Sequence, residues 1–301
     1  MQYLTKLSLL LLFALSFTAC DDDDDNFVTG DDLREELAET YAERYLANQA
    51  YPAVTTRLAD LDQAGAYEFQ DMFIDELKDR GEVQSGWKLG FTGDSPRPFG
   101  APSPVFGQLF ESQSIAPGST IDISETFVSA AMGVELAIFI AEDAEFETSD
   151  FPLSRETVLN LIGSVAPLTE FPELGFEEGP MGIDYRDLIA NNAGAKAYVV
   201  GERVAIANLD DDDDDAMDID NINVRIFKNN ELISEAISGD ALGSQVEALE
   251  FLLRQLALRG EGVKAGQIIA TGSLGGDLGL EPGEYRFEYA GLGTNTFTVV
   301  E

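Results

Sequence analysis

The segment GVELAIFIA at residues 133–141 constrains the fold more than any other part of this sequence. Successive side chains of a strand point to opposite faces, so one face of this segment carries Val134, Leu136, Ile138 and Ile140. The other face carries Gly133, Glu135, Ala137 and Phe139. A single carboxylate on such a strand costs free energy to bury without a partner. A hard cation would offset that cost, and we expect Glu170 and Lys88 to share the pocket with Glu135.

Composition places the chain among globular proteins but excludes several partners. Its 301 residues, 45% of them hydrophobic, suffice for one large domain or two small ones. The formal net charge is -38, from 56 acidic and 18 basic residues. Nucleic acids and anionic lipid surfaces require basic patches, so both are excluded as expected partners.

Two residue counts exclude whole classes of chemistry. Cys20 is the single cysteine, which rules out an intrachain disulfide and a cysteine metal cluster. The chain has no histidine. Histidine-dependent triads and histidine-ligated zinc sites are therefore excluded as well.

The first 20 residues have the features of a targeting segment. Lys6 precedes an apolar run from Leu7 to Phe17, which is short for a membrane span. The run ends in FTAC, which is similar to a bacterial lipoprotein cleavage site with Cys20 as the lipidated residue. We expect an exported lipoprotein, anchored on the periplasmic or cell-surface side; a short transmembrane anchor is the alternative.

Two runs of aspartate are expected to be solvated. Residues 21–30 begin with Asp21–Asp25 and form an acidic tether, for which a sorting signal is the alternative. Asp210–Asp215, continued by Asp218 and Asp220, is predicted to be a surface insertion. A calcium loop is less favoured there, because the run lacks the glycine that the sharp turn of such a loop needs.

Helical periodicity marks the region before residue 86. Apolar residues recur at helical spacing in 31–48 and again in 66–80, which predicts a helical N-terminal region over 31–85. Further on, a helix is predicted near 155–162. Residues 187–200 predict a turn of helix, a bend and a buried strand.

The last third of the chain predicts a hairpin, a helix and three strands. The hairpin turns at Asn229-Asn230. Ser244 and Glu247 have capping-box spacing for a helix that runs to Arg259. The glycines of GSLGGDLG do not form a dinucleotide fingerprint, because no helix follows them.

Several segments together resemble a known family. They are GWKLGFT (86–92), SPVFGQLF (103–110), GVELAIFIAED (133–143), APLTEF (166–171), AYEFQ (66–70) and the tail from VRIF to AGLGT. This combination is similar to the 2-keto-4-pentenoate hydratases and 4-oxalocrotonate decarboxylases of the fumarylacetoacetate hydrolase superfamily. The resemblance implies an α+β fold: a rolled, mixed β-sheet with outer helices, the catalytic domain covering 86–301.

The resemblance also implies a metal site. In the family, an E-x-E pair and a third Glu hold Mg²⁺ or Mn²⁺, which chelates a 2-oxo or 2-enol carboxylate, and a lysine assists the oxyanion. By this comparison Glu135 and Glu170 are metal ligands and Lys88 is catalytic. Gly133 stands where the first Glu is expected, which implies a weakened site.

Other family positions are matched in part. Val105 stands where the hydratases have Asp and the decarboxylases an aliphatic residue. Asn192 matches within NNAG, while its neighbours Asn191 and Gly194 depart from the family's DNAS. Thr271 and Ser273 match a segment that lines the substrate pocket.

Each of these residues also has an ordinary structural interpretation. Lys88 and Glu135 would then be solvent-exposed side chains of strands, and Thr271 and Ser273 ordinary turn residues. The family interpretation predicts a metal-dependent hydratase or decarboxylase of a small 2-oxo or 2-hydroxydienoate acid. The alternatives are an impaired lipoprotein that binds a small carboxylate or a partner, and a structural lipoprotein without a ligand. Homo-oligomerisation is left open.

Overall fold

Two long apolar strands, β5 (Ala131–Ile140) and β6 (Ile162–Phe171), pair at the centre of the computed structural model. The structure describes residues 30–94, 96–206 and 217–301. One sheet is built outward from this pair, in the order β2-β1-β11-β5-β6-β7-β3, with β12 added to β5 and β8 to β6. The remaining strands of this sheet are β1 (Gln84–Gly90), β2 (Val105–Phe110), β3 (Ser114–Ile115), β7 (Ala197–Val200), β8 (Val204–Ala205), β11 (Ile268–Ala270) and β12 (Leu278–Gly279).

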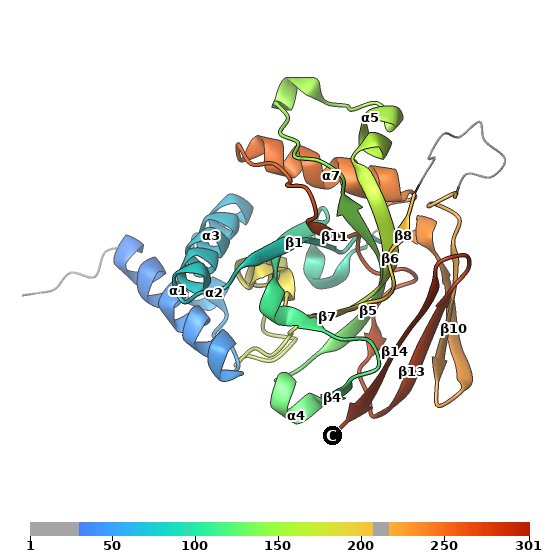
Figure 1. The fold of residues 1–301 in the computed structure, drawn as a ribbon. Coiled ribbons are helices and arrows are strands. Elements are labelled where there is room, and N and C mark those ends of the chain that lie inside the picture. Colours follow the sequence, from blue (N-terminus) through green and yellow to red (C-terminus); the bar gives the residue numbers. More distant parts are fainter. Residues whose placement is uncertain (1–29, 95, 207–216) are drawn as a thin grey trace, which may run out of the picture.

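A second sheet packs against the first (Figure 1). Its strands are β10 (Glu231–Ile237), β9 (Asn223–Lys228), β13 (Gly283–Tyr289), β14 (Gly293–Val300) and β4 (Thr120–Asp122), in that order. The predicted hairpin turn is confirmed, with Asn229 and Asn230 both at positive φ. The ring of Phe297 meets that of Phe171 edge to face, at 5.2 Å between centroids, and so joins the two sheets.

Helices cover the outside of the sheets, as Figure 1 shows. The N-terminal group is α1 (Gly30–Ala47), α2 (Val54–Arg57) and α3 (Gln63–Asp79). The predicted helices of this region are confirmed; α3 starts earlier than expected because Asp62 caps it through the Gly65 amide. Tyr67 of α3 stacks on Phe106 of β2, at 4.6 Å between ring centroids. The helical region and the sheets therefore share one core.

The other helices are α4 (Ile123–Thr126), α5 (Arg155–Asn160), α6 (Tyr185–Ala190) and α7 (Gln245–Leu258). Ser244 caps α7 through the Val246 amide, but its own amide donates to the Ala241 carbonyl at 3.1 Å, whereas the predicted capping box requires donation to Glu247. Asp220, from the end of the second acidic run, completes the cap by accepting from Gln245 N at 2.6 Å and Ser244 Oγ at 3.0 Å. Asp220 therefore has a structural role rather than that of a calcium ligand.

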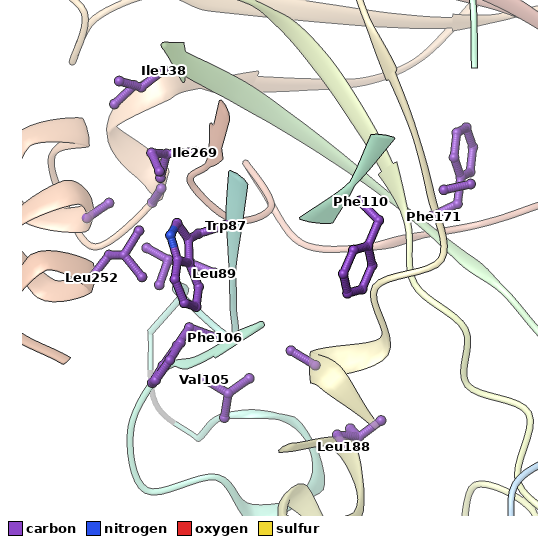
Figure 2. Close-up of a cluster of buried hydrophobic side chains, with 14 of the residues drawn as sticks. Trp87, Leu89, Val105, Phe106, Phe110, Ile138, Phe171, Leu188, Leu252 and Ile269 are labelled. Carbon is purple, nitrogen blue, oxygen red and sulfur yellow. The ribbon is translucent and has the colours of Figure 1, made fainter. Parts of the chain in front are cut away.

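Strand β1 shows how alternation separates the core from the site. Trp87 and Leu89 point into the cluster around Phe106 and Leu252 in Figure 2. Lys88, between them, must point to the opposite face of the sheet. The expected α+β class, with a rolled mixed sheet and outer helices, is confirmed, and the roll consists of two hydrogen-bonded sheets.

Some predictions fall on residues outside the described part. These are the targeting segment with Cys20, the aspartates of residues 21–25, and residues 210–215. Within residues 30–94, 96–206 and 217–301, no helix is long and apolar enough to cross a membrane.

Candidate active site

Three strands bring the predicted catalytic lysine and the two predicted ligand carboxylates together. Lys88 comes from β1, Glu135 from β5 and Glu170 from β6, and each residue is no more than 3% exposed. Lys88 Nζ donates to Glu170 Oε1 at 2.7 Å and to the Ala193 carbonyl at 2.9 Å. The interpretation of Lys88 and Glu135 as solvent-exposed side chains is therefore wrong.

A row of small residues lets the lysine reach across the sheet. The register pairs Lys88 with Ala270, Ala270 with Ala137, and Ala137 with Ala166. Paired residues share a face, so these methyl groups lie on the same side as Lys88 and leave room above the sheet. Lys88 Nζ nevertheless reaches Glu170, which pairs with Gly133 four residues along β5 from Ala137.

Backbone and tyrosine contacts hold Glu135. Its Oε2 accepts from the Gly272 amide at 2.9 Å. Below it, the Tyr289 hydroxyl contacts the carbonyl oxygens of Glu135, at 2.8 Å, and Leu168, at 3.0 Å. Tyr289 thus joins β5 to β6 beside the two carboxylates.

The two carboxylates are held in an environment that disfavours their charged forms. Burial raises the pKa of Glu135, and the nearby charge of Glu170 raises it further, while Lys88 opposes both effects. Burial also raises the pKa of Glu170 and Lys88 again opposes it. One ammonium group is not enough to compensate two buried carboxylates, so the site favours an additional positive charge or a bound proton.

Gly133 occupies a central position in this arrangement. It pairs with Glu170 across β5 and β6, on the same face as Glu135. A Cβ atom at Gly133 would lie 2.6 Å from Ser273 Oγ, 3.2 Å from Glu135 Oε1 and 3.5 Å from Asp277 Oδ1. Ser273 Oγ donates to Asp277 Oδ1. The place of a side chain at residue 133 is therefore already taken by Ser273 and Asp277.

A cavity of about 660 Å³ opens next to this position. Ser273, Asp277, Thr92 and Arg97 are among its lining residues, and Arg97 is the only cationic one of the described residues there. Thr92 is 2% exposed, and its hydroxyl has no hydrogen-bond partner among the described residues. A buried hydroxyl without a partner costs free energy, which a bound polar ligand would recover.

The other predicted substrate-binding residues lie at the edge of the site. Thr271 Oγ1 donates to the Leu136 carbonyl at 3.1 Å. The Asn192 side chain bonds both backbone groups of Gln108, at 2.6 and 2.8 Å. It thereby fixes the turn whose next residue, Ala193, accepts from Lys88. Thr271 and Asn192, like Lys88, Glu135 and Glu170, are not among the cavity's lining residues, and their contact with a substrate stays a prediction.

Four residues of the site were not predicted from the sequence: Thr92, Arg97, Asp277 and Tyr289. Thr92 ends the GWKLGFT segment, so its place after the lysine strand is a signal that sequence analysis could use. Arg97 and Asp277 lie in glycine-rich loops, and Tyr289 lies on the second sheet. Nothing in their spacing relates them to Lys88 or Glu135.

The donor set fits a hard divalent cation incompletely. In the described part of the chain, no three acidic, histidine or cysteine side chains already surround one point as metal ligands would. Glu135 and Glu170 nevertheless offer two buried carboxylates on one face of paired strands, and carboxylate oxygens are what Mg²⁺ prefers. Mg²⁺ retains several waters, so two carboxylates are a sufficient basis for a weak site.

Comparison with known proteins agrees with this fold. Residues 79–300 match the family model described as "Fumarylacetoacetate (FAA) hydrolase C-terminal". A 2-keto-4-pentenoate hydratase of Paraburkholderia xenovorans (strain LB400) is 23% identical over 252 residues, covering 83% of this chain and 88% of the relative. A 4-oxalocrotonate decarboxylase of Pseudomonas putida is 26% identical over 243 residues, covering 80% and 87%.

Solved structures show the same fold. The 4-oxalocrotonate decarboxylase from Pseudomonas putida G7, complexed with magnesium and adipate, aligns with a TM-score of 0.78 at 21% identity, covering 90% of this chain and 99% of that chain. Fumarylpyruvate hydrolase from Pseudomonas aeruginosa, in complex with Mn²⁺ and pyruvate, aligns with a TM-score of 0.54 at 15% identity, covering 72% and 90%. The resemblance inferred from the motifs is confirmed, and the chain belongs to the fumarylacetoacetate hydrolase family.

Proposed function

We propose that this protein is a metal-dependent lyase, a hydratase or decarboxylase, that acts on a small 2-oxo or 2-hydroxydienoate acid. The observation that carries the proposal is the buried Lys88–Glu170 pair beside Glu135. An incompletely compensated charge cluster of this kind costs stability, and such clusters concentrate at functional sites. The names of the curated relatives support the same reaction class.

The roles follow from the positions of the groups. Glu135 and Glu170 would hold Mg²⁺ or Mn²⁺, which when bound supplies positive charge for the 2-oxo and carboxylate oxygens of the substrate. Lys88 donates to Glu170 and therefore lies beside the place that the 2-oxo oxygen of the substrate would take. Its ammonium group would stabilise negative charge that develops on that oxygen, or give it a proton. Ser273 and Thr92 lie on the cavity side with their hydroxyl-bearing side chains, and Arg97 is a cation that could pair with a substrate carboxylate among the lining carboxylates Asp94, Asp240 and Asp277.

Decarboxylase chemistry is favoured over hydration by Val105. This residue is 2% exposed on β2, and it offers no proton-transfer group where the resemblance places an Asp in the hydratases. Hydration of a 2-hydroxydienoate requires a group that delivers a proton to a substrate carbon and a group that accepts a proton from the attacking water. Loss of CO₂ requires mainly stabilisation of the enolate, which Lys88 and a cation supply.

The experiment is a substrate assay with each relative's reaction. Consumption of 4-oxalocrotonate and of 2-hydroxypenta-2,4-dienoate is followed by ultraviolet absorbance with Mn²⁺ and with a chelator. The proposal expects metal-dependent turnover of at least one substrate and loss of turnover in Lys88→Met. Absence of turnover of both substrates by the wild type would contradict it.

A second candidate function is binding without turnover, and Gly133 is the observation that favours it. With Ser273 and Asp277 in the place of the first carboxylate, the site can retain a small carboxylate ligand while losing the metal that the reaction needs. This alternative expects saturable binding of a small 2-oxo acid and no effect of Mn²⁺. The assay above distinguishes the two.

We further propose that the protein is exported and anchored to a membrane by a lipid on Cys20. The support is the FTAC motif after a short apolar run. A lipid anchor would place the cavity outside the cytoplasm. The partner proposed for the cavity there is a small carboxylate. The acidic surface is consistent with a tethered protein that does not bind nucleic acid.

A further inference from the structure

Asp277 lies in the same row across the sheet as Gly133 and Glu170. β12 pairs with β5 in an antiparallel register, Leu278 with Met132 and Gly279 with Ala131. Extending this register by one residue sets Asp277 opposite Gly133, whose other neighbour is Glu170. Residues opposite one another in a sheet share a face. The row therefore carries a carboxylate on each side of the glycine.

The side chain of Asp277 points toward the place where a residue 133 side chain would start. Its Oδ1 lies 3.5 Å from the ideal Cβ position of Gly133, and Glu135 Oε1 lies 3.2 Å from the same point. Ser273 Oγ holds Asp277 in this orientation by donating to it. The charge of Asp277 also raises the pKa of both Glu135 and Glu170, as expected for a third carboxylate nearby.

Two glycines shape the loop that carries Asp277. Gly275 and Gly276 precede it with φ of +75° and +92°, a conformation that glycine adopts without strain. No side chain follows from β5 to fill the corner between Glu135 and Glu170. The groups that approach this corner from outside β5 are Ser273 Oγ and Asp277 Oδ1, at 2.6 and 3.5 Å from the ideal Cβ position of Gly133.

An independent observation indicates that a ligand enters at this place. Thr92 lines the same cavity as Asp277, is 2% exposed and has a hydroxyl without a partner in the described part of the chain. Buried polar groups are nearly always satisfied in native proteins. Thr92 Oγ1 lies 2.1 Å from the ideal Cβ position of Gly272, whose amide donates to Glu135, so the unpartnered hydroxyl borders the site and a polar ligand there would satisfy it.

We propose that Asp277 is the third carboxylate of the metal site and replaces, from a loop, the strand ligand that Gly133 lacks. This inference rests on the proposed function, because it concerns the same cation. Two ligands of the proposed site, Glu135 and Glu170, belong to strands of the sheet. The third, Asp277, belongs to the loop that borders the cavity. Metal binding would then fix Ser273 and Asp277 at the wall of the substrate cavity.

The test is a titration with Mn²⁺, with free Mn²⁺ measured by electron paramagnetic resonance. Four proteins are compared: the wild type, Asp277→Asn, Asp94→Asn, and the double variant Glu135→Gln/Glu170→Gln. Asp94 lines the same cavity, so Asp94→Asn makes the same charge change away from the Gly133 row. Thermal unfolding of each metal-free variant checks that it is folded.

The proposal expects that Asp277→Asn weakens Mn²⁺ binding by about tenfold or more, while Asp94→Asn changes the Kd by less than about twofold. A triple variant, Gly133→Glu/Ser273→Ala/Asp277→Asn, moves the carboxylate back to the strand and removes the hydroxyl in its way. It should recover most of the lost affinity.

Two results would overturn the proposal, and they differ in what else they reject. If Asp277→Asn binds like the wild type while the double variant does not bind, Asp277 is not a ligand and the proposed function stands. If the wild type itself binds no Mn²⁺, or binds no better than the double variant, both the inference and the metal-dependent function are rejected.

Discussion

Glu170 faces Gly133 across the β5–β6 ladder, so the strand position opposite this carboxylate carries no side chain, and Ser273 Oγ occupies the space beside it. The ammonium group of Lys88 compensates part of the negative charge of the buried carboxylates, because it donates to Glu170 Oε1 at 2.7 Å. Glu135 lies on the same face, two residues along β5, and has no ammonium group of its own among its hydrogen-bond partners in the described part of the chain. The chemistry that we propose depends on this imbalance, because it is what a cation would relieve.

Removal of the lysine should destabilise the metal-free protein. Lys88→Met leaves Glu170 buried without its cationic partner, and such changes typically cost about 3 kcal/mol or more. Chemical unfolding at pH 8 measures the effect. The double variant Lys88→Met/Glu170→Gln should recover much of the loss, since no unpaired charge remains in the pair. Equal stability of Lys88→Met and the wild type would contradict the buried ion pair.

Stability in the presence of a chelator should fall as the pH rises from about 4.5 toward 8. Burial raises the pKa of Glu135 from its ordinary value near 4.5 to about 8. Between these values the folded protein holds a proton that the unfolded chain has released, so rising pH favours the unfolded state. The contribution is about 1.4 kcal/mol for each pKa unit of difference. Stability is greatest below the unfolded value.

The control for this pH dependence is Glu135→Gln, which cannot ionise. Its unfolding free energy should vary less with pH over the same range, measured by urea denaturation at several pH values. An identical pH profile in the two proteins would show that Glu135 is not the group responsible.

Thr92 should matter for a ligand rather than for folding. Thr92→Val keeps the shape and removes a hydroxyl that has no partner, so stability should stay equal or rise by about 1 kcal/mol. The same variant should raise KM for the acid substrate about tenfold, because a ligand hydrogen bond is lost. Thr271→Val is a useful comparison, since Thr271 already donates to Leu136 and its replacement should lower stability. Unchanged KM in Thr92→Val would exclude ligand contact.

Cys20→Ala should release the protein from membranes. A diacyl anchor on Cys20 gives stable membrane attachment, which a protein without it lacks. Detergent-phase partition of cell extracts, with mass spectrometry of the N-terminal peptide, measures the difference. Wild-type protein found without lipid on Cys20 would contradict the anchor. Membrane retention of Cys20→Ala would instead support the transmembrane alternative.

Much of the fold could be predicted because its signals are local. Helical spacing in residues 31–48 and 66–80, and the Asn229-Asn230 turn, act over a few residues and were found at the expected places. The prediction that Lys88, Glu135 and Glu170 share one site came from the combination of motifs. The alternation of side chains along a strand predicts the face of the sheet on which a residue lies, but it does not predict which strands are neighbours.

The rest of the site could not be predicted because it depends on sheet register between distant segments. The pairing of β12 with β5 brings Asp277 beside Gly133, and the sequence GSLGGDLG contains no pattern that predicts this pairing. Tyr289 reaches Glu135 only because the second sheet packs against the first. The cap that Asp220 provides to α7 is likewise a tertiary contact, with Gln245 N, which the capping-box spacing of Ser244 and Glu247 does not predict.

The most direct test of the central claim is calorimetric titration of the wild type and of Glu135→Gln/Glu170→Gln with Mn²⁺. The account predicts one saturable site in the wild type that is absent from the double variant, because the two strand carboxylates are the fixed part of the site. Equal binding by both proteins would assign the metal to the acidic surface. That result, or no binding by either, would contradict a metal-dependent lyase and leave a binding protein on this fold.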